Sequence, residues 1–100
     1  MTKLLKAIPP GEILLEEFMK PLGVSQNALA RAIGVNPGRV SEIIHGRGGI
    51  SAPTALALGL CFGTSPEMWL NLQSRYDLKV AVRSYGKALR KKVRAFKQAA

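Results

Sequence analysis

A segment near the middle of the chain, SQNALARAIGVNPGRVSEIIHGR (25–47), carries the side chains best suited to contact with another molecule. Within it, Arg39 has a guanidinium group that can bond a guanine edge in two places. Glu42 can accept from a base, and Ser41 can bond either a base or a phosphate. Its other polar groups suit phosphate oxygens. The segment is therefore predicted to bind DNA.

Each of these side chains has a predicted role and a plainer alternative. Arg39 is the best candidate to read a base, and a phosphate contact is nearly as well supported. Glu42 either accepts a hydrogen bond from cytosine or pairs with a neighbouring arginine. His45 is expected at a phosphate, although a lone histidine is more often structural or simply exposed. The predicted DNA-contacting residues are Gln26, Asn36, Pro37, Gly38, Arg39, Ser41, Glu42, His45 and Arg47.

Two short helices joined by a tight turn must position these side chains. Ser25 is suited to cap the first helix, Gly34 to form a left-handed turn, and Asn36 to cap the second helix. Pro37 fits the first position of that helix, where a missing N–H costs nothing. Pro37 and Gly38 have no side-chain donors, so we expect them to permit close approach to DNA. The pattern predicts a helix-turn-helix, whose second helix enters the major groove.

The flanking sequence predicts three more helices and no strand. One is expected from Pro10 to about Lys20, ended by Pro21 and Gly23. Another begins after Ser51. The last begins after Ser65 and is expected to continue, with a break near Gly86, into a basic segment. The core face of the helix after Ser51 is predicted to consist of Leu56, Leu60, Cys61 and Phe62, with Cys61 a buried apolar residue.

An apolar stripe on the last helix has two interpretations. Met68, Trp69, Leu72, Tyr76 and Val80 are one, three, four and four residues apart, which places them along one helix face. In a chain this small, such a stripe forms either the internal core or the interface of a dimer.

The composition favours one small all-α domain with an uneven charge. The chain has 100 residues, 47% of them hydrophobic, and a net charge of +9. Residues 1–50 contain six basic and four acidic side chains, whereas residues 51–100 contain nine and two. Excess positive charge attracts phosphate backbones, although a basic run is more often only a solubilising surface.

Several classes of function are not supported by the residues available. The single cysteine excludes an intramolecular disulfide and a cysteine-based metal cluster. One histidine and six carboxylates suggest no catalytic set, so we expect no enzymatic activity, no metal and no cofactor. The N-terminus does not fit a signal peptide, and the longest uncharged run is too short to span a bilayer. A cytoplasmic location is expected.

Two long segments around the turn resemble a known family. PPGEILLEEFMKPLGVSQNALARAIGV and RVSEIIHGRGGISAPTALALGLCFGTSPEMWLNLQSRYDL are similar to the XRE/Cro-type helix-turn-helix proteins. More narrowly, they resemble the HigA (VapI-like) antitoxins, because both the P-G-E-x-L-x-E-E-F start and the F-G-T-S-P-E-x-W-L-N-L-Q-x-x-Y-D-L ending are specific to that group. The basic run 83–97 is not part of this signature.

The resemblance implies a compact five-helix, lambda-repressor-like DNA-binding fold, usually in a homodimer. It gives Gln26 a contact with the DNA backbone. It implies a partner, a HigB-type toxin with a RelE-like fold that cleaves mRNA, and repression of the chain's own operon through operator DNA. The expected organisation is an N-terminal arm (1–9), the helix-turn-helix domain (10–82) and a basic C-terminal helical extension (83–100).

Two other functions remain open from the sequence. The chain is either such an antitoxin or a stand-alone XRE-family transcriptional repressor without a toxin partner. A protein-binding adaptor that has lost DNA binding is a further alternative, because residues 1–50 carry a net charge of only +2.

Overall fold

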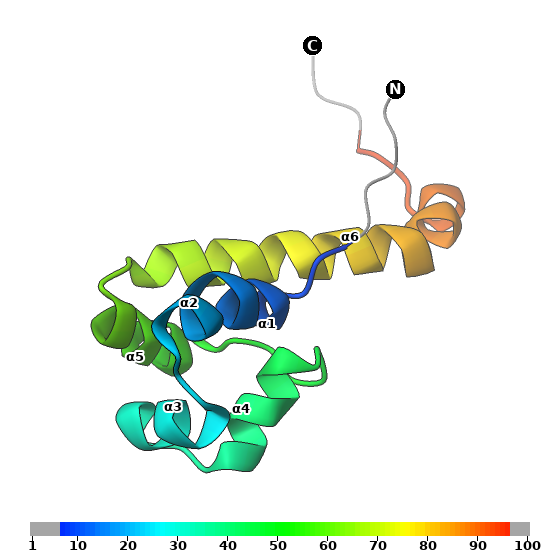
Figure 1. Ribbon diagram of the computed structural model, residues 1–100. Helices are drawn as coiled ribbons and strands as arrows, with labels where there is room; N and C mark the ends of the chain where they lie inside the picture. The colour runs from blue at the N-terminus through cyan, green and yellow to red at the C-terminus, as the bar shows by residue number, and fades with distance from the viewer. Residues whose placement is uncertain (1–6, 97–100) are drawn as a thin grey trace.

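The computed structural model describes residues 7–96, and within them the chain folds into five helices with no strand (Figure 1). The all-α, five-helix fold predicted from the sequence is confirmed. The predicted N-terminal arm lies largely outside the described residues, as do residues 97–100. The first helix is continuous and consists of α1 (Pro10–Ile13), a π-helical segment η1 (Leu14–Met19) and α2 (Lys20–Leu22); α3 (Gln26–Ile33), α4 (Pro37–Ile44), α5 (Ala52–Phe62) and α6 (Pro66–Lys92) follow.

Four helices begin with the same local device, a side chain that caps the first turn. Ser25, Asn36, Ser51 and Ser65 each accept a hydrogen bond from the backbone amide three residues later, at 3.0, 3.0, 3.4 and 3.1 Å. Such a bond satisfies an amide that has no partner within the helix. These four starts were predicted from residue types alone and are confirmed.

The end of the first helix differs from the prediction. Pro21 and Gly23 were expected to end it. The helix continues through Pro21 to Leu22, and Gly23 ends it as predicted, with a φ of 66°. The amide of Lys20 donates to the carbonyl of Leu15, five residues back instead of four. This wider π-helical turn comes immediately before Pro21, which has no amide hydrogen and needs room for its ring. The π segment therefore lets the helix continue through the proline.

All five helices contribute buried side chains to one core. Trp69 is fully buried, and its indole Nε1 donates to Thr64 Oγ1 at 2.8 Å. Phe18 packs against both Trp69 and Phe62, with ring centroids 5.1 and 5.3 Å apart. The other buried hydrophobic residues are Leu14, Met19, Leu29, Ala30, Val40, Ile43, Ile44, Ile50, Ala55 and Leu58.

The face of α5 that enters the core was predicted wrongly. Leu56 and Leu60 are 55% and 88% exposed and Cys61 is exposed, so these three positions were wrong, whereas Phe62 is half-buried and packs against the core as predicted. Every side of α5 is apolar, so hydrophobic spacing cannot select a face. Size selects it instead, because a Cβ at Gly59 would lie only 2.7 Å from the Thr64 carbonyl oxygen. The buried face is formed by Thr54, Ala55, Leu58 and Gly59.

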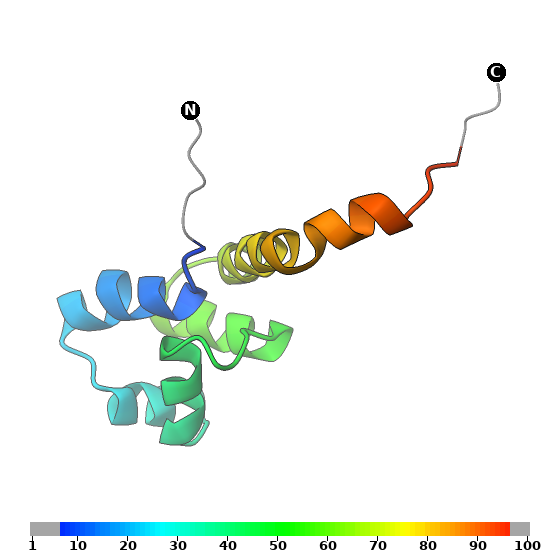
Figure 2. The same ribbon diagram turned by 90° about the vertical axis from the view of Figure 1, so that its right-hand side faces the viewer.

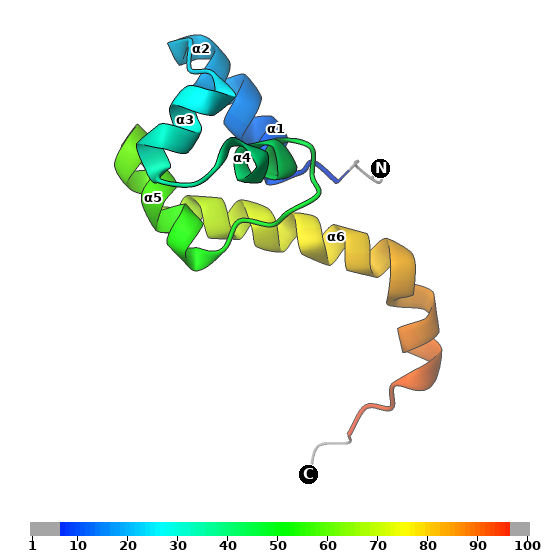
Figure 3. The same ribbon diagram turned by 90° about the horizontal axis from the view of Figure 1, so that it is seen from below.

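Helix α6 continues into the basic segment, as predicted. It passes through Gly86 without a break and ends at Lys92. A single glycine in a long helix costs only about 1 kcal/mol relative to alanine. Its distal half projects beyond the other helices (Figures 2 and 3), so the predicted boundary at residues 82 and 83 falls inside it. Within residues 7–96, no helix combines the length and apolar character needed to cross a membrane.

Candidate nucleic-acid interface

Helices α3 and α4 form the predicted helix-turn-helix. Gly34 ends α3 in the left-handed conformation, with φ of 76°, and Asn36 caps α4 two residues later. Between them the partly buried Val35 packs against the core. On α4, Val40 and Ile43 are buried, so the opposite side of the helix must face outward.

The outward side of α4 presents a stripe with little bulk at its start. Gly38, Glu42 and His45 are four and three residues apart, which places them on one helix face, and all three are exposed. Gly38 has no side chain to hold a partner away. The stripe therefore combines room for close approach with two polar groups further along the helix.

His45 is oriented by a hydrogen bond to the preceding turn. Its Nδ1 lies 2.8 Å from the carbonyl oxygen of Ser41 and 3.3 Å from the Ser41 hydroxyl. A carbonyl only accepts, so Nδ1 carries the hydrogen in this contact. The other ring nitrogen, Nε2, is left as the acceptor of a neutral His45, and the imidazole can offer it to a partner.

The starts of α3 and α4 also carry predicted contact residues. Gln26 is the first residue of α3 and is partly exposed, while Asn36 and Pro37 are exposed at the start of α4. The Asn36 side-chain oxygen already accepts from the Arg39 amide, so its amide nitrogen remains for a partner. Unpaired backbone amides and the helix dipole make both starts favourable for phosphate.

Arg39, predicted as the best base reader, lies at the edge of this surface and is bonded within the protein. Its Nη2 donates to the carbonyl oxygen of Gly49 at 2.7 Å. Its Nη1 lies 3.7 Å from Glu42 Oε1, a loose ion pair that corresponds to the second interpretation of Glu42. The Arg39 side chain is 30% exposed. Part of its hydrogen-bonding capacity is thus used to hold the loop after α4.

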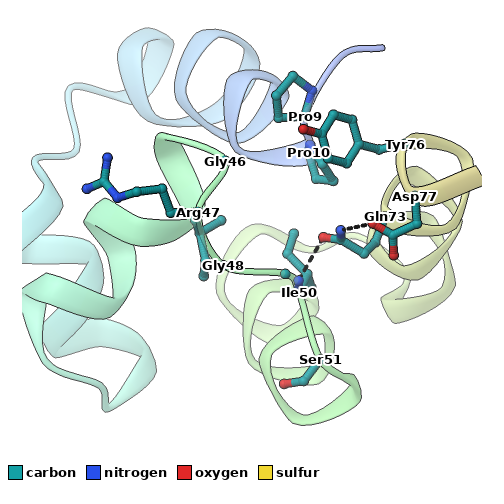
Figure 4. A pocket seen from close by; sticks show the side chains of 12 residues that line it. Pro9, Pro10, Gly46, Arg47, Gly48, Ile50, Ser51, Gln73, Tyr76 and Asp77 are labelled. Carbon is teal, nitrogen blue, oxygen red and sulfur yellow. Dashed lines mark hydrogen bonds between the residues drawn. The ribbon is translucent and has the colours of Figure 1, made fainter. Parts of the chain in front are cut away.

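Arg47 lies in that loop and is exposed. The loop follows Gly46, whose φ is 74°, and continues through Gly48 and Gly49 before α5 begins. Figure 4 shows the Arg47 side chain pointing away from Gln73, toward the side of the helix-turn-helix. A guanidinium there can reach a phosphate outside the stripe on α4.

The apolar stripe predicted on α6 divides between core and surface. Trp69 is buried, and Met68 and Leu72 are partly buried against the core. Tyr76 is half-buried, whereas Val80 is 39% exposed. The first part of the stripe is internal, and its last residue lies on the projecting part of α6.

Reasoning from the sequence missed two polar residues of α6 that contact this region. Gln73 Oε1 accepts from the amide of Ile50 at 2.8 Å, and Gln73 Nε2 donates to Asp77 Oδ1 at 3.0 Å. Both residues belong to the NLQSRYDL segment that carries the family resemblance. The signal in the sequence was that these two residues are polar although they lie beside the apolar stripe of the last helix.

The fold and this surface define a helix-turn-helix DNA-binding domain. The helix-turn-helix family model matches residues 15–69 of the chain. The chain is 53% identical over 75 residues to virulence-associated protein I of Dichelobacter nodosus. The aligned residues make up 75% of this chain and 69% of that protein.

Solved structures agree with that match. Antitoxin GraA has a TM-score of 0.90 and 47% identity, covering 92% of this chain and 99% of that one. Pseudomonas aeruginosa antitoxin HigA, solved with the higBA promoter, has a TM-score of 0.88 and 40% identity, covering 92% and 100%. The chain belongs to the helix-turn-helix family and, within it, to the HigA-type antitoxins. This family consists of DNA-binding proteins, and the chain is not an enzyme.

Proposed function

We propose that this chain is a cytoplasmic, homodimeric antitoxin that represses its own operon by binding operator DNA and neutralises a RelE-like, mRNA-cleaving toxin. The DNA-binding half rests on the exposed stripe of Gly38, Glu42 and His45 on α4, the second helix of the motif. The Pseudomonas aeruginosa HigA was solved with its promoter DNA, which supports the same role for this chain.

The contacts divide into two kinds. The stripe on α4 is placed to meet base edges, with Ser41 beside it, because the second helix of such a motif enters the major groove. Gln26 and Arg47 flank the stripe and are proposed to bond phosphates, which orient the protein on DNA without reading its sequence. Asn36 and Pro37 complete the proposed contact surface at the start of α4.

A shallow apolar surface on α5 supports the dimer. Leu60 and Cys61 line a groove of about 460 Å³ together with Ala57, and Ala32 and Ile33 of α3 complete it. Helix α5 carries no charged residue, so a second copy placed against it brings no repulsion and removes apolar area from water. A dimer joined here would present two α4 helices to two half-sites of an operator.

Toxin binding is supported by sequence similarity to proteins named as antitoxins. One of them is HigA-1 of Vibrio cholerae, to which the chain is 42% identical over 73 residues. Co-expression with the product of a small neighbouring toxin gene tests this half. A stable complex that restores growth is expected. Absence of such a gene and of any complex would instead indicate a stand-alone repressor.

Fluorescence anisotropy with DNA from upstream of the chain's own gene tests the operator half. Gly38→Glu places a carboxylate where α4 approaches the DNA, and it should abolish selective binding. A Cβ at Gly38 meets only Asn36 Oδ1, at 3.2 Å, so the domain should remain folded. Gly86→Glu makes the same change on the projecting part of α6 and is the matched control. Selective binding by the Gly38 variant would refute the assignment of α4.

A further inference from the structure

The peptide group that joins Gly49 to Ile50 is hydrogen-bonded on both sides. Its carbonyl oxygen accepts from Arg39 Nη2 at 2.7 Å, and its N–H donates to Gln73 Oε1 at 2.8 Å. The oxygen and hydrogen of a trans peptide point in opposite directions. Arg39 on α4 and Gln73 on α6 therefore hold one peptide plane from opposite sides, and Figure 4 shows the Gln73 half of this arrangement.

The bonds continue to a carboxylate. Gln73 Nε2 donates to Asp77 Oδ1 at 3.0 Å (Figure 4). The series starts at the cation of Arg39, passes through a backbone amide and a side-chain amide, and ends at the anion of Asp77. Every donor points the same way along it, so each bond polarises the next. Bonds with a charged partner at either end are the stronger kind.

This series joins two helices that pack little against each other directly and that share only α1 as a neighbour. Helix α4 packs against α1 and α3, and α6 packs against α1 and α5. An open cleft of about 510 Å³ lies beside the loop, with Pro9, Gly46 and Tyr76 among its lining residues. The Ile50 side chain is buried, 4% exposed, so its amide depends on a protein partner. Apart from the packing of both helices against α1, the series is thus the direct hydrogen-bonded link from α4 through the loop to α6.

We propose that Arg39 and Gln73 are positioning residues, which set α4 against α6 through the Gly49–Ile50 peptide and so place α4 for DNA binding. This inference rests on the proposed function. Arg39 then acts through the loop and not by reading a base, and the reading falls to the stripe of Gly38, Glu42 and His45. It also gives a physical role to Gln73 and Asp77, which lie outside the motif.

The first test removes the α6 side of the series. Gln73→Ala should weaken binding to the operator by roughly 3- to 30-fold, the usual range for residues that act through another element. The loss should be similar across operators altered at single base pairs, because a displaced helix weakens all its contacts together. Asn71→Ala, an exposed neighbour on the same helix, is the control and should bind normally. Thermal unfolding of each variant distinguishes a displaced α4 in a folded domain from loss of the fold, because only the latter lowers the melting temperature strongly.

The second test separates reading from positioning at Arg39. Arg39→Ala should give the same even loss as Gln73→Ala, and the double variant should lose little more than either single one, because both side chains hold the same peptide. A base reader behaves differently. Its removal abolishes discrimination at one base pair and adds to the effect of Gln73→Ala.

The third test is a rescue. Gln73→Glu keeps an acceptor for the Ile50 amide but places a second carboxylate beside Asp77, so it should weaken operator binding. Adding Asp77→Asn exchanges the amide and the carboxylate between the two positions and restores one donor and one acceptor there. Recovery of operator affinity in this double variant, with little change in its melting temperature, supports a positioning role.

The outcomes are distinct for the two proposals. Normal affinity in Gln73→Ala, additive losses with Arg39→Ala, or loss of discrimination at a single base pair would each overturn the positioning role and leave DNA binding in place. Failure of the unaltered protein to prefer its operator over unrelated DNA would overturn the proposed function itself.

Discussion

Gly11 of α1 lies directly against the backbone of Ile43 in α4, so close that a Cβ at Gly11 would overlap the Ile43 carbonyl oxygen. Gly11 is buried, and it is the second residue of the first helix. The missing side chain lets α1 approach the proposed recognition helix at backbone distance. The P-G-E start therefore sets how α4 is held from the side opposite its proposed DNA-binding face.

We predict that Gly11→Ala destabilises the domain by about 1–3 kcal/mol, because a methyl group forces α1 and α4 apart. Urea unfolding followed by the fluorescence of Trp69, the one tryptophan of the chain, measures this effect. Gly86→Ala is the control: its added Cβ meets only Arg90 and Val82, at 3.5 and 3.6 Å, and it should stabilise α6 by roughly 0.5–1 kcal/mol. Equal stabilities for the Gly11 variant and the unaltered chain would contradict the close approach.

The bond between Trp69 and Thr64 gives a second prediction. Thr64→Val keeps the shape of the side chain but removes the only acceptor that Trp69 Nε1 has among the described residues. Leaving that N–H unpaired in the core should cost about 1–3 kcal/mol. Thr64→Ser keeps the hydroxyl and should lose less. If the two variants unfold at the same denaturant concentration, the hydrogen bond adds nothing.

Local signals were enough to predict much of this fold. The starts of α3, α4, α5 and α6 follow from a capping side chain and an early proline or polar residue, which act within one turn of the chain. The buried side of α4 follows from the spacing of its apolar residues. These features can be predicted without knowing which other helices pack against them.

Features that depend on contacts between helices were missed. The buried side of α5 is decided by Gly59 against the Thr64 carbonyl, which no hydrophobic period reveals. The part played by Arg39 was missed for the same kind of reason, since its partner Gly49 is a backbone carbonyl in a loop and has no side chain to signal it. Arg39 was predicted to read a base because its guanidinium can bond a guanine edge in two places, and nothing in the sequence indicates its bond to Gly49.

Salt dependence provides a third prediction, for the phosphate contact of Arg47. Its guanidinium is exposed and points away from Gln73, so its removal should leave the fold intact. Arg47→Ala should weaken binding to operator and unrelated DNA alike, and should lower the slope of log K against log salt by about 1. Titrations at several salt concentrations measure that slope. A change of preference between operators, with the slope unchanged, would mean that Arg47 reads a base.

The last prediction concerns the dimer proposed through α5. Leu60 is 88% exposed in the single chain, so Leu60→Glu should leave the monomer's stability nearly unchanged. In a dimer joined at this groove, the same change would bury a carboxylate among apolar residues of the partner copy, which is strongly unfavourable. Analytical ultracentrifugation should therefore show a folded monomer, and binding to a full operator should weaken far more than binding to one half-site. Leu22→Glu, at a 65% exposed position on α2, is the matched control and should remain dimeric. A dimer that survives Leu60→Glu but dissociates with Leu22→Glu would place the interface on the first helix instead.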